Sequence, residues 1–346
     1  MLLAWSHRAR RSPNLEVAAW AWEESEMKAA VVEKFGAAPK FRDFAEPVAQ
    51  AGEKLVRVTA AGLHPIVKGL AAGTHYASAE GLPFIAGVDG VGKLENGQRV
   101  YFGTWRKPYG TFAEIAPAPE WLALNLPDGL PDETAAALAN PGMSSWAALK
   151  YRARFQAGES VVILGATGVA GRLAVQIAKR LGARRVVACG RNAATLEDCK
   201  ANGADVTISL SQHHDAVVAA LRNEFVEPGV DVVLDYLWGA PAQAAFEAML
   251  TKGGDRKSGN TRYVQIGESA GSKLELAASV LRSSGVEIMG SGFGSVELKD
   301  IMKAVGEFLA GAAKKPFTMK IEQVPLGDVE SAWSRKEEGV RIVFRP

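Results

Sequence analysis

The sequence predicts an α/β protein of two domains, a small and mostly β domain followed by a doubly wound parallel sheet. Its 346 residues exceed what one ordinary hydrophobic core uses, and they suit two domains. Short strand-like segments separated by turns fill the first part of the chain, whereas strands and helices alternate beyond Gly158. This change of pattern indicates two architectures in one chain.

The first part of the chain has the two-residue periodicity that is typical of strands. Five short segments carry it, at residues 28–33, 54–60, 90–94, 98–102 and 111–116. Closely spaced strands with glycine turns predict a small β domain with barrel-like closure. A helical pattern begins near Asp132, and Pro141 predicts a break in that helix.

The second part predicts a regular alternation of strands and helices. Strands are expected at residues 160–164, 185–188, 205–209 and 230–234, and helices at residues 169–181, 195–202 and 216–225. Strands joined through helices imply βαβ crossovers, so we expect a parallel sheet with both faces covered.

Charge and composition exclude several functional classes. The chain has 40 Lys and Arg against 38 Asp and Glu, and its net charge of +2 creates no field that would attract nucleic acid or an anionic membrane. No apolar run approaches the roughly 18 residues that a bilayer requires. Cys189 and Cys199 are too few for a disulfide framework, which favours a cytoplasmic location.

Residues 1–26 differ from the remainder of the sequence. Basic residues follow the short apolar start, an order opposite to that of a secretory signal, and Glu16, Glu23 and Glu24 contradict a transit peptide. We therefore predict a flexible N-terminal extension, with Met27 opening the first domain.

The most informative segment is a glycine-rich turn between the strand at 160–164 and the helix that follows it. It reads Ala166-x-Gly168-x-x-Gly171, so alanine replaces the first glycine of the dinucleotide-binding pattern. Small residues allow backbone N–H groups to approach a pyrophosphate, and the helix N-terminus adds a partial positive charge. A plain tight turn that needs glycine only for packing is the structural alternative.

The residues after the second strand of this unit indicate which dinucleotide binds. NAD-binding proteins place an acidic residue there, about 20 residues beyond the turn. This chain has Gly190, Arg191 and Asn192 instead. A guanidinium suits the 2′-phosphate of NADPH, because it donates charge-assisted hydrogen bonds that an acid could not provide.

These segments resemble the medium-chain dehydrogenase/reductase superfamily, and within it the zinc-free, zeta-crystallin-like quinone oxidoreductases. The resemblance runs from Met27 to the C-terminus, on segments at residues 60–65, 83–92, 110–114, 165–171, 232–236 and 263–267. It implies a GroES-like catalytic domain at residues 27–150, completed by about 316–346, and a Rossmann NADPH-binding domain at 151–315.

The resemblance also implies a set of cofactor-binding residues and an assembly. The cofactor-binding residues would be Ala166, Thr167, Gly168, Val169, Ala170, Gly190, Arg191, Asn192, Ile266, Gly267, Ser291 and Gly292. Family members commonly associate through the nucleotide-domain sheets. Residues 286–293 are therefore expected to form an edge strand that joins a homodimer.

Zinc is not expected in this chain. His64 stands where the alcohol-dehydrogenase branch has its first cysteine ligand, but Val88 replaces the ligand histidine and cannot coordinate a metal. Residues 103–110 contain no cysteine, so the structural zinc lobe is missing too. His64 is then expected either to contact the cofactor or simply to pack.

The reaction that the resemblance implies is hydride transfer from NADPH to a quinone or an α,β-unsaturated carbonyl compound. A polar group should stabilise the developing oxyanion, and the candidates are Lys68, then His64 and Tyr76. The Tyr and Arg usual in quinone oxidoreductases are absent from residues 68–73, which puts quinone recognition in question. An enoyl-thioester reductase, or a non-catalytic NADPH-binding crystallin-like protein, remains as an alternative.

Overall fold

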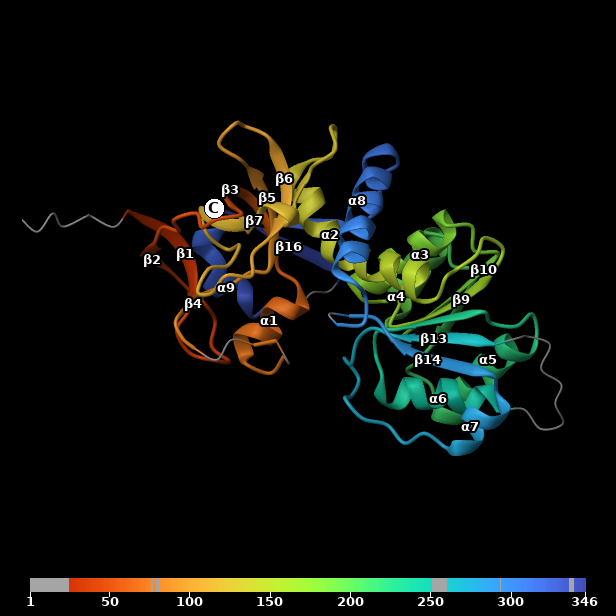
Figure 1. The fold of residues 1–346 in the computed structure, drawn as a ribbon. Coiled ribbons are helices and arrows are strands. Elements are labelled where there is room, and N and C mark those ends of the chain that lie inside the picture. The colour runs from red at the N-terminus through yellow and green to blue at the C-terminus, as the bar shows by residue number, and fades with distance from the viewer. Residues whose placement is uncertain (1–24, 76, 79–80, 251–259, 293, 336–338) are drawn as a thin grey trace, which may run out of the picture.

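The computed structural model describes residues 25–75, 77–78, 81–250, 260–292, 294–335 and 339–346. Two bodies of different architecture lie beside each other, one rich in antiparallel strands and one built on a parallel sheet (Figure 1). The predicted α/β class with a doubly wound parallel sheet is confirmed. No helix in the described part of the chain is long and apolar enough to cross a bilayer.

The β-rich body contains segments from both ends of the chain. Its elements are β1 (Glu26–Val32), β2 (Lys40–Ala45), β3 (Glu53–Gly62), α1 (Pro65–Ala72), β4 (Phe84–Ile85), β5 (Asp89–Lys93), β6 (Arg99–Gly103), β7 (Ile115–Pro119), β8 (Ala123–Asn125), β15 (Lys320–Pro325), α9 (Val329–Trp333) and β16 (Val340–Arg345). The larger sheet has the order β15-β16-β3-β5-β6-β8, with β7 also paired to β3. Because β16 pairs with β3, the C-terminal segment completes a sheet that the first part of the chain begins.

The β-rich body differs from the expectation in two respects. Its larger sheet is an open path whose end strands, β15 and β8, are not paired with each other among the described residues, so the expected barrel-like closure is absent there. The strand expected at 111–116 is found as β7, which starts four residues later at Ile115. Pro117 and Pro119 lie in β7, which pairs with β3 alone, and an outer strand is where proline is tolerated.

The parallel sheet has the order β11-β10-β9-β12-β13-β14. Its strands and helices are β9 (Ser160–Leu164), α3 (Val169–Arg180), β10 (Arg185–Gly190), α4 (Ala193–Ala201), β11 (Val206–Ser209), α5 (His214–Val226), β12 (Val232–Asp235), α6 (Gly239–Met249), β13 (Thr261–Gln265), α7 (Ala278–Ser283), β14 (Val286–Gly290) and α8 (Leu298–Lys314). The strand order reverses between β9 and β12, and a crevice for ligands is expected at the carboxyl ends of strands there.

Helix α2 (Asp132–Ala147) joins the two bodies, and the expected break at Pro141 is wrong. Ser144 and Ser145 donate their hydroxyl protons to the Pro141 carbonyl oxygen at 2.8 and 3.4 Å. The helix also packs against α8, α3 and β3. Tertiary packing of this kind overrides the roughly 3 kcal/mol that an internal proline costs a helix.

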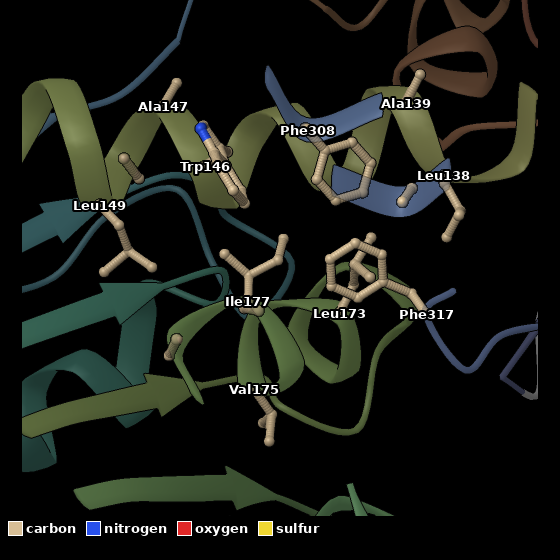
Figure 2. Close-up of a cluster of buried hydrophobic side chains, with 14 of the residues drawn as sticks. Leu138, Ala139, Trp146, Ala147, Leu149, Leu173, Val175, Ile177, Phe308 and Phe317 are labelled. Carbon is tan, nitrogen blue, oxygen red and sulfur yellow. The ribbon is translucent and has the colours of Figure 1, made fainter. Parts of the chain in front are cut away.

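A large apolar cluster fills the space between α2, α3 and α8 (Figure 2). Ile177 of α3 faces Trp146 of α2, and Leu173 lies beside Phe317. Phe308 of α8 stacks on Phe317 with ring centroids 5.0 Å apart. Burial at this density makes each large side chain here worth about 2–5 kcal/mol against alanine. The cluster therefore holds α2 against the domain that is built on the parallel sheet.

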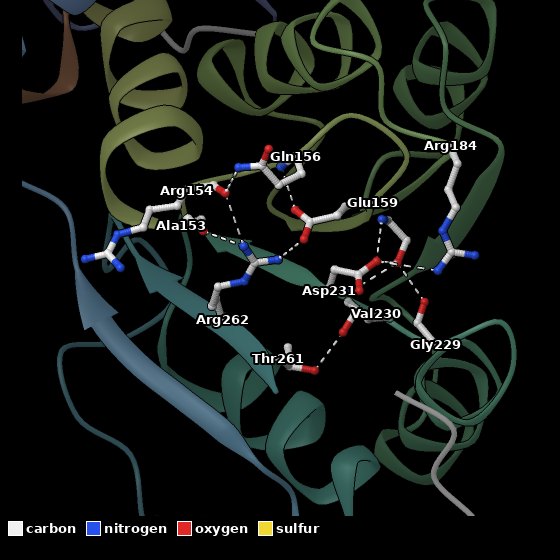
Figure 3. Close-up of polar contacts among 11 residues, drawn as sticks. Ala153, Arg154, Gln156, Glu159, Arg184, Gly229, Val230, Asp231, Thr261 and Arg262 are labelled. Carbon is white, nitrogen blue, oxygen red and sulfur yellow. Dashed lines mark hydrogen bonds and ion pairs between the residues drawn. The ribbon is translucent and has the colours of Figure 1, made fainter. Parts of the chain in front are cut away.

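At the amino ends of the parallel strands, opposite the carboxyl edge, side chains form a set of polar contacts with one another and with the backbone (Figure 3). Arg262 donates to the Ala153 carbonyl oxygen and to Glu159 Oε1, each at 2.6 Å. Asp231 Oδ2 accepts the backbone N–H of Ser160 at 2.8 Å and its hydroxyl at 2.9 Å. The amino edge is thus occupied by internal contacts, which leaves the carboxyl edge as the place for a ligand.

Candidate cofactor and active site

The glycine-rich turn joins β9 to α3 at the reversal point of the sheet. Gly165 adopts a left-handed conformation with φ 91°, and α3 begins at Val169 with Gly168 as its N-cap. Gly168 is exposed, and no side chain caps the helix. The first N–H groups of α3, together with the partial charge of the helix, are therefore available to an anion.

Two glycines hold this turn against the sheet. A Cβ added at Gly171 would lie 2.6 Å from Ala166 Cα and would also strike the Gly165 carbonyl oxygen. A Cβ at Gly190 would lie 2.7 Å from Thr167 Oγ1. Both glycines are thus required for packing, while Gly168, with only the Gly165 oxygen at 3.4 Å, leaves open space on the ligand side.

Arg191 and Asn192 follow directly after β10. Asn192 Oδ1 accepts the Thr195 N–H at 2.9 Å and caps α4, so its oxygen is engaged and only its amide nitrogen could serve a ligand. The Arg191 side chain is exposed, and no ion pair to it is found among the described residues. Its guanidinium is free to bind an anion beside the turn.

The other predicted cofactor-binding residues lie at the ends of β13 and β14. Ile266 and Gly267 donate their N–H groups to the Asp235 carbonyl oxygen at 2.7 and 3.1 Å. Ser291 donates its N–H to the Gln265 carbonyl oxygen at 2.8 Å, and Gly292 follows it. These residues therefore share the carboxyl edge with the glycine-rich turn, and their predicted contacts with a cofactor remain predictions.

Tyr236 is a polar residue at this edge that the sequence analysis did not single out as functional. Its hydroxyl lies 2.7 Å from Ser145 Oγ of α2. Burial raises the pKa of Tyr236 to about 12, although the Ser145 and Ser144 hydroxyls oppose the shift. A hydroxyl that follows a buried strand at the reversal point was the signal that could have identified it.

Asp235 shapes the turn that follows Tyr236. Its Oδ1 accepts the N–H groups of Leu237 and Trp238 at 2.8 and 3.0 Å, and its Oδ2 accepts the Tyr263 hydroxyl at 2.7 Å. Trp238 is held at φ 55° and ψ −158°, a conformation normally reserved for glycine that costs about 1–3 kcal/mol. Such strain is maintained only where the surroundings over-determine the backbone, so this turn is a rigid part of the site.

A separate polar cluster lies buried inside the β-rich domain. Asp89 is 3.6 Å from His64 Nε2, and its Oδ2 accepts the Tyr101 hydroxyl at 2.7 Å. Burial raises the pKa of Asp89 to about 7 against the opposing effects of Tyr101 and the nearby Arg341. Burial, and then the charge of Arg341, lower the pKa of His64 well below its ordinary value. His64 is therefore neutral at physiological pH.

A zinc ion does not fit this cluster. His64 and Asp89 are its only neighbouring donors of the usual kind, and the described residues contain no group of three or more His, Cys, Asp or Glu side chains placed to hold a metal. Zinc sites need at least three protein ligands. We derive no chemistry from a metal here.

The predicted catalytic candidates are dispersed. His64 is fully buried, which agrees with the packing role that the sequence left open. Lys68 on α1 donates from Nζ to the Arg335 carbonyl oxygen at 3.3 Å. Tyr76 lies outside the described residues. A catalytic role for any of the three remains a prediction.

Fold and site together define a two-domain α/β protein of the dinucleotide-binding type. A family profile described as zinc-binding dehydrogenase matches residues 170–310. The chain is 30% identical over 224 residues to the probable NADPH-dependent quinone reductase tdiC of Emericella nidulans. The aligned segment covers 61% of each protein. It is 29% identical over 218 residues to the trans-enoyl reductase pgmF of Aspergillus terreus, which covers 54% of this chain and 58% of that protein.

The solved quinone oxidoreductase of Thermus thermophilus, reported also as a complex with NADPH, is similar over 92% of this chain and 100% of its own, with 26% identity and a TM-score of 0.75. These matches support a quinone-oxidoreductase-like protein of the medium-chain dehydrogenase/reductase type, the resemblance that the sequence analysis gave. The matched part spans about three fifths of the length of the two curated relatives.

Proposed function

We propose that this chain is an NADPH-dependent, zinc-free oxidoreductase that delivers hydride to a quinone or an α,β-unsaturated carbonyl compound. The observation that carries the proposal is the uncapped N-terminus of α3 beneath a glycine-rich turn, with an exposed guanidinium one residue beyond β10. The relatives named as NADPH-dependent quinone reductase and quinone oxidoreductase support it.

In this proposal, different residues of the chain bind different parts of NADPH. The N–H groups of Thr167, Val169 and Ala170 bind the pyrophosphate, whereas the Gly168 N–H donates to the Gly165 carbonyl oxygen. Arg191 binds the 2′-phosphate through charge-assisted hydrogen bonds. Bound NADPH supplies the hydride. Tyr236, which follows β12 at the reversal point, holds α2 in place through its hydroxyl contact with Ser145.

The balanced reaction takes one hydride from NADPH and one proton from solvent. A quinone becomes a hydroquinone, or an enone becomes a saturated ketone, and NADP⁺ is released. Lys68 is the leading predicted donor of a hydrogen bond to the developing oxyanion. It lies on α1 of the β-rich domain and would have to leave the Arg335 carbonyl to do so.

A second candidate is an enoyl-thioester reductase, which the similarity to a trans-enoyl reductase favours. A third, a non-catalytic NADPH-binding crystallin-like protein, keeps the cofactor site without turnover. NADPH oxidation measured with 1,4-quinones, enones and crotonyl-coenzyme A separates them. Turnover of a quinone or an enone supports the proposal, whereas tight NADPH binding with no turnover of any acceptor contradicts it.

We also propose a homodimer formed in the cytoplasm. β14 is the outermost strand of the described parallel sheet, so one row of its backbone groups is available to pair with a second copy. The sequence predicts an edge strand at residues 286–293; β14 covers Val286–Gly290 of that range, and residue 293 lies outside the described residues. Sedimentation velocity tests the assembly, and a monomer at micromolar concentration would contradict it.

A further inference from the structure

One face of α3 is polar and lies against the part of the chain that returns to the β-rich domain. Arg172, Gln176 and Arg180 form this face, because residues four apart lie on the same side of a helix. All three side chains are partly buried, whereas the neighbouring Leu173 and Ile177 belong to the large apolar cluster. We call the three polar residues the α3 clamp.

Gln176 binds the connection between α8 and β15 with both ends of its amide. Its Nε2 donates to the Thr318 carbonyl oxygen at 3.0 Å, and its Oε1 accepts the Thr318 N–H at 2.8 Å. Both backbone groups of one residue are thus satisfied by a single side chain. Thr318 lies two residues before β15 begins, so this contact fixes the point from which the strand starts.

Arg180 holds the same connection one turn further along α3. Its Nη1 and Nη2 donate to the carbonyl oxygens of Gly311 and Pro316 at 3.3 and 3.2 Å. Its guanidinium carbon also lies 3.5 Å from the centroid of the Phe317 ring. Gly311 is in the last turn of α8, where a cation also complements the helix dipole.

Arg172, in the first turn of α3, binds the chain immediately before β16. Its Nη2 donates to the Gly339 carbonyl oxygen, and β16 begins at the next residue, Val340. Gly339 has φ 75°, and a Cβ there would lie 2.8 Å from Arg172 Nη2, so glycine suits this close approach. Because Lys320 and Val340 are paired in register, the α3 clamp holds the amino ends of two adjacent strands.

Strand β16 carries this constraint to α1, the helix of the leading catalytic candidate. Leu63, which lies two residues before α1, donates its N–H to the Ile342 carbonyl oxygen at 2.9 Å. The Leu63 carbonyl oxygen accepts from Nη1 of Arg341. Consecutive residues of β16 therefore hold Leu63 by both of its backbone groups. A shift of β16 relative to α3 would move the start of α1, and with it Lys68, relative to the cofactor.

The α3 clamp differs from the apolar cluster in what it fixes. Apolar burial between α2, α3 and α8 is non-directional, whereas hydrogen bonds require a defined distance and angle. Every acceptor of the clamp named above is a backbone carbonyl oxygen. The clamp therefore fixes the path of the main chain between the domains.

We propose that Arg172, Gln176 and Arg180 are positioning residues, which hold the amino ends of β15 and β16 on the cofactor-binding helix and so set the distance between the nicotinamide and α1. This inference rests on the proposed function, because it assumes NADPH bound at the N-terminus of α3. A misplacement of about 1 Å costs about 100-fold in rate, so the clamp acts on hydride transfer without touching the reacting atoms.

The test removes the central contact without altering charge. Gln176→Leu deletes both hydrogen bonds to Thr318 and keeps nearly the same side-chain volume. Gln243→Leu is the matched control, because Gln243 is also partly buried and bonds to Glu247 Oε1 of its own helix, α6, at 3.3 Å. Arg180→Gln is the second clamp variant and should behave like Gln176→Leu if that protein is too unstable to purify.

Kinetics distinguish a positioning role from a structural one. We expect Gln176→Leu to lower kcat with 1,4-naphthoquinone by about tenfold, while the dissociation constant for NADPH changes by less than about twofold. The primary deuterium isotope effect on kcat should rise, because misplacement makes hydride transfer more rate-limiting. A mere loss of folded protein would lower the apparent kcat and leave the isotope effect unchanged, as should Gln243→Leu.

Hydrogen exchange tests the contact itself, without cofactor or acceptor. The Thr318 N–H is bonded to Gln176 Oε1, so it should exchange about tenfold faster in Gln176→Leu than in wild type. Mass spectrometry of peptides that cover residues 315–320 measures this. A peptide from β9, which the clamp does not include, should exchange at the wild-type rate.

The outcomes separate the two proposals. If wild-type protein oxidises NADPH with the quinone but Gln176→Leu changes neither kcat nor the isotope effect, the positioning role is wrong and the proposed function survives. Unchanged exchange at Thr318 would show that the contact is not made in solution, which also overturns the inference. If the wild-type protein binds no NADPH, both proposals fail together.

Discussion

The guanidinium of Arg191 lies one residue beyond β10, exposed, while its neighbour Asn192 is engaged in capping α4. Because a charged hydrogen bond contributes about 1.5–3 kcal/mol, Arg191→Gln should weaken NADPH binding about 10- to 100-fold and leave NADH binding nearly unchanged. Fluorescence titration with both cofactors measures this. Lys299→Gln, at an exposed residue on α8, serves as the control. Equal losses for NADPH and NADH would refute the assignment.

A second single residue, Asp89, makes the free energy of unfolding depend on pH. Its pKa rises from 3.8 to about 7 in the folded protein, so its protonated form stabilises the fold and this stabilisation is lost as pH rises through that range. The full shift corresponds to at most about 4 kcal/mol. In urea unfolding at pH 5.5, 6.5 and 8, Asp89→Asn should lose less stability with rising pH than wild type. Parallel pH dependences would show that Asp89 does not titrate in this range.

Helix α2 provides a test at the scale of elements. Gly→Ala in a helix ordinarily stabilises by about 1 kcal/mol, but a Cβ at Gly142 would lie 2.7 Å from Phe308 Cε2 and would strike two further ring atoms. Gly142→Ala should therefore destabilise by about 1–3 kcal/mol through overpacking. Gly306→Ala on α8, where a Cβ meets nothing within 4 Å, should stabilise slightly. Denaturant unfolding of the two variants measures the change in unfolding free energy for each. If both variants were more stable than wild type, the close contact between Gly142 and Phe308 would be refuted.

Helices α3 and α2 show what a single sequence can and cannot predict. The glycine-rich turn and the start of α3 at Val169 were predictable, because glycine spacing and an amphipathic pattern are local signals. The continuation of α2 through Pro141 was not, since it depends on packing against α3 and α8 from distant parts of the chain. The Tyr236–Ser145 contact was missed for the same reason, because it joins residues far apart in sequence.

At the scale of the whole molecule, the two domains are joined at more than one place. Helix α2 contacts β3 and β5 of one domain and α3 and α8 of the other, and β16 returns the chain to β3. A large apolar cluster runs from Tyr101 and Val343 in the β-rich domain to Leu173 and Phe308. A shared core of this kind should make unfolding of the two domains cooperative.

This connection predicts how a ligand will alter thermal stability. NADPH at 100 times its dissociation constant should stabilise the folded state by about 2.7 kcal/mol. In a protein of this size that raises Tm by several degrees. Because α2 and the shared core join the domains, differential scanning calorimetry should show one transition that moves as a whole, and the shift should shrink in Arg191→Gln. Two transitions, with only one moved by NADPH, would show that the domains unfold independently and that the cluster around α2 does not couple them.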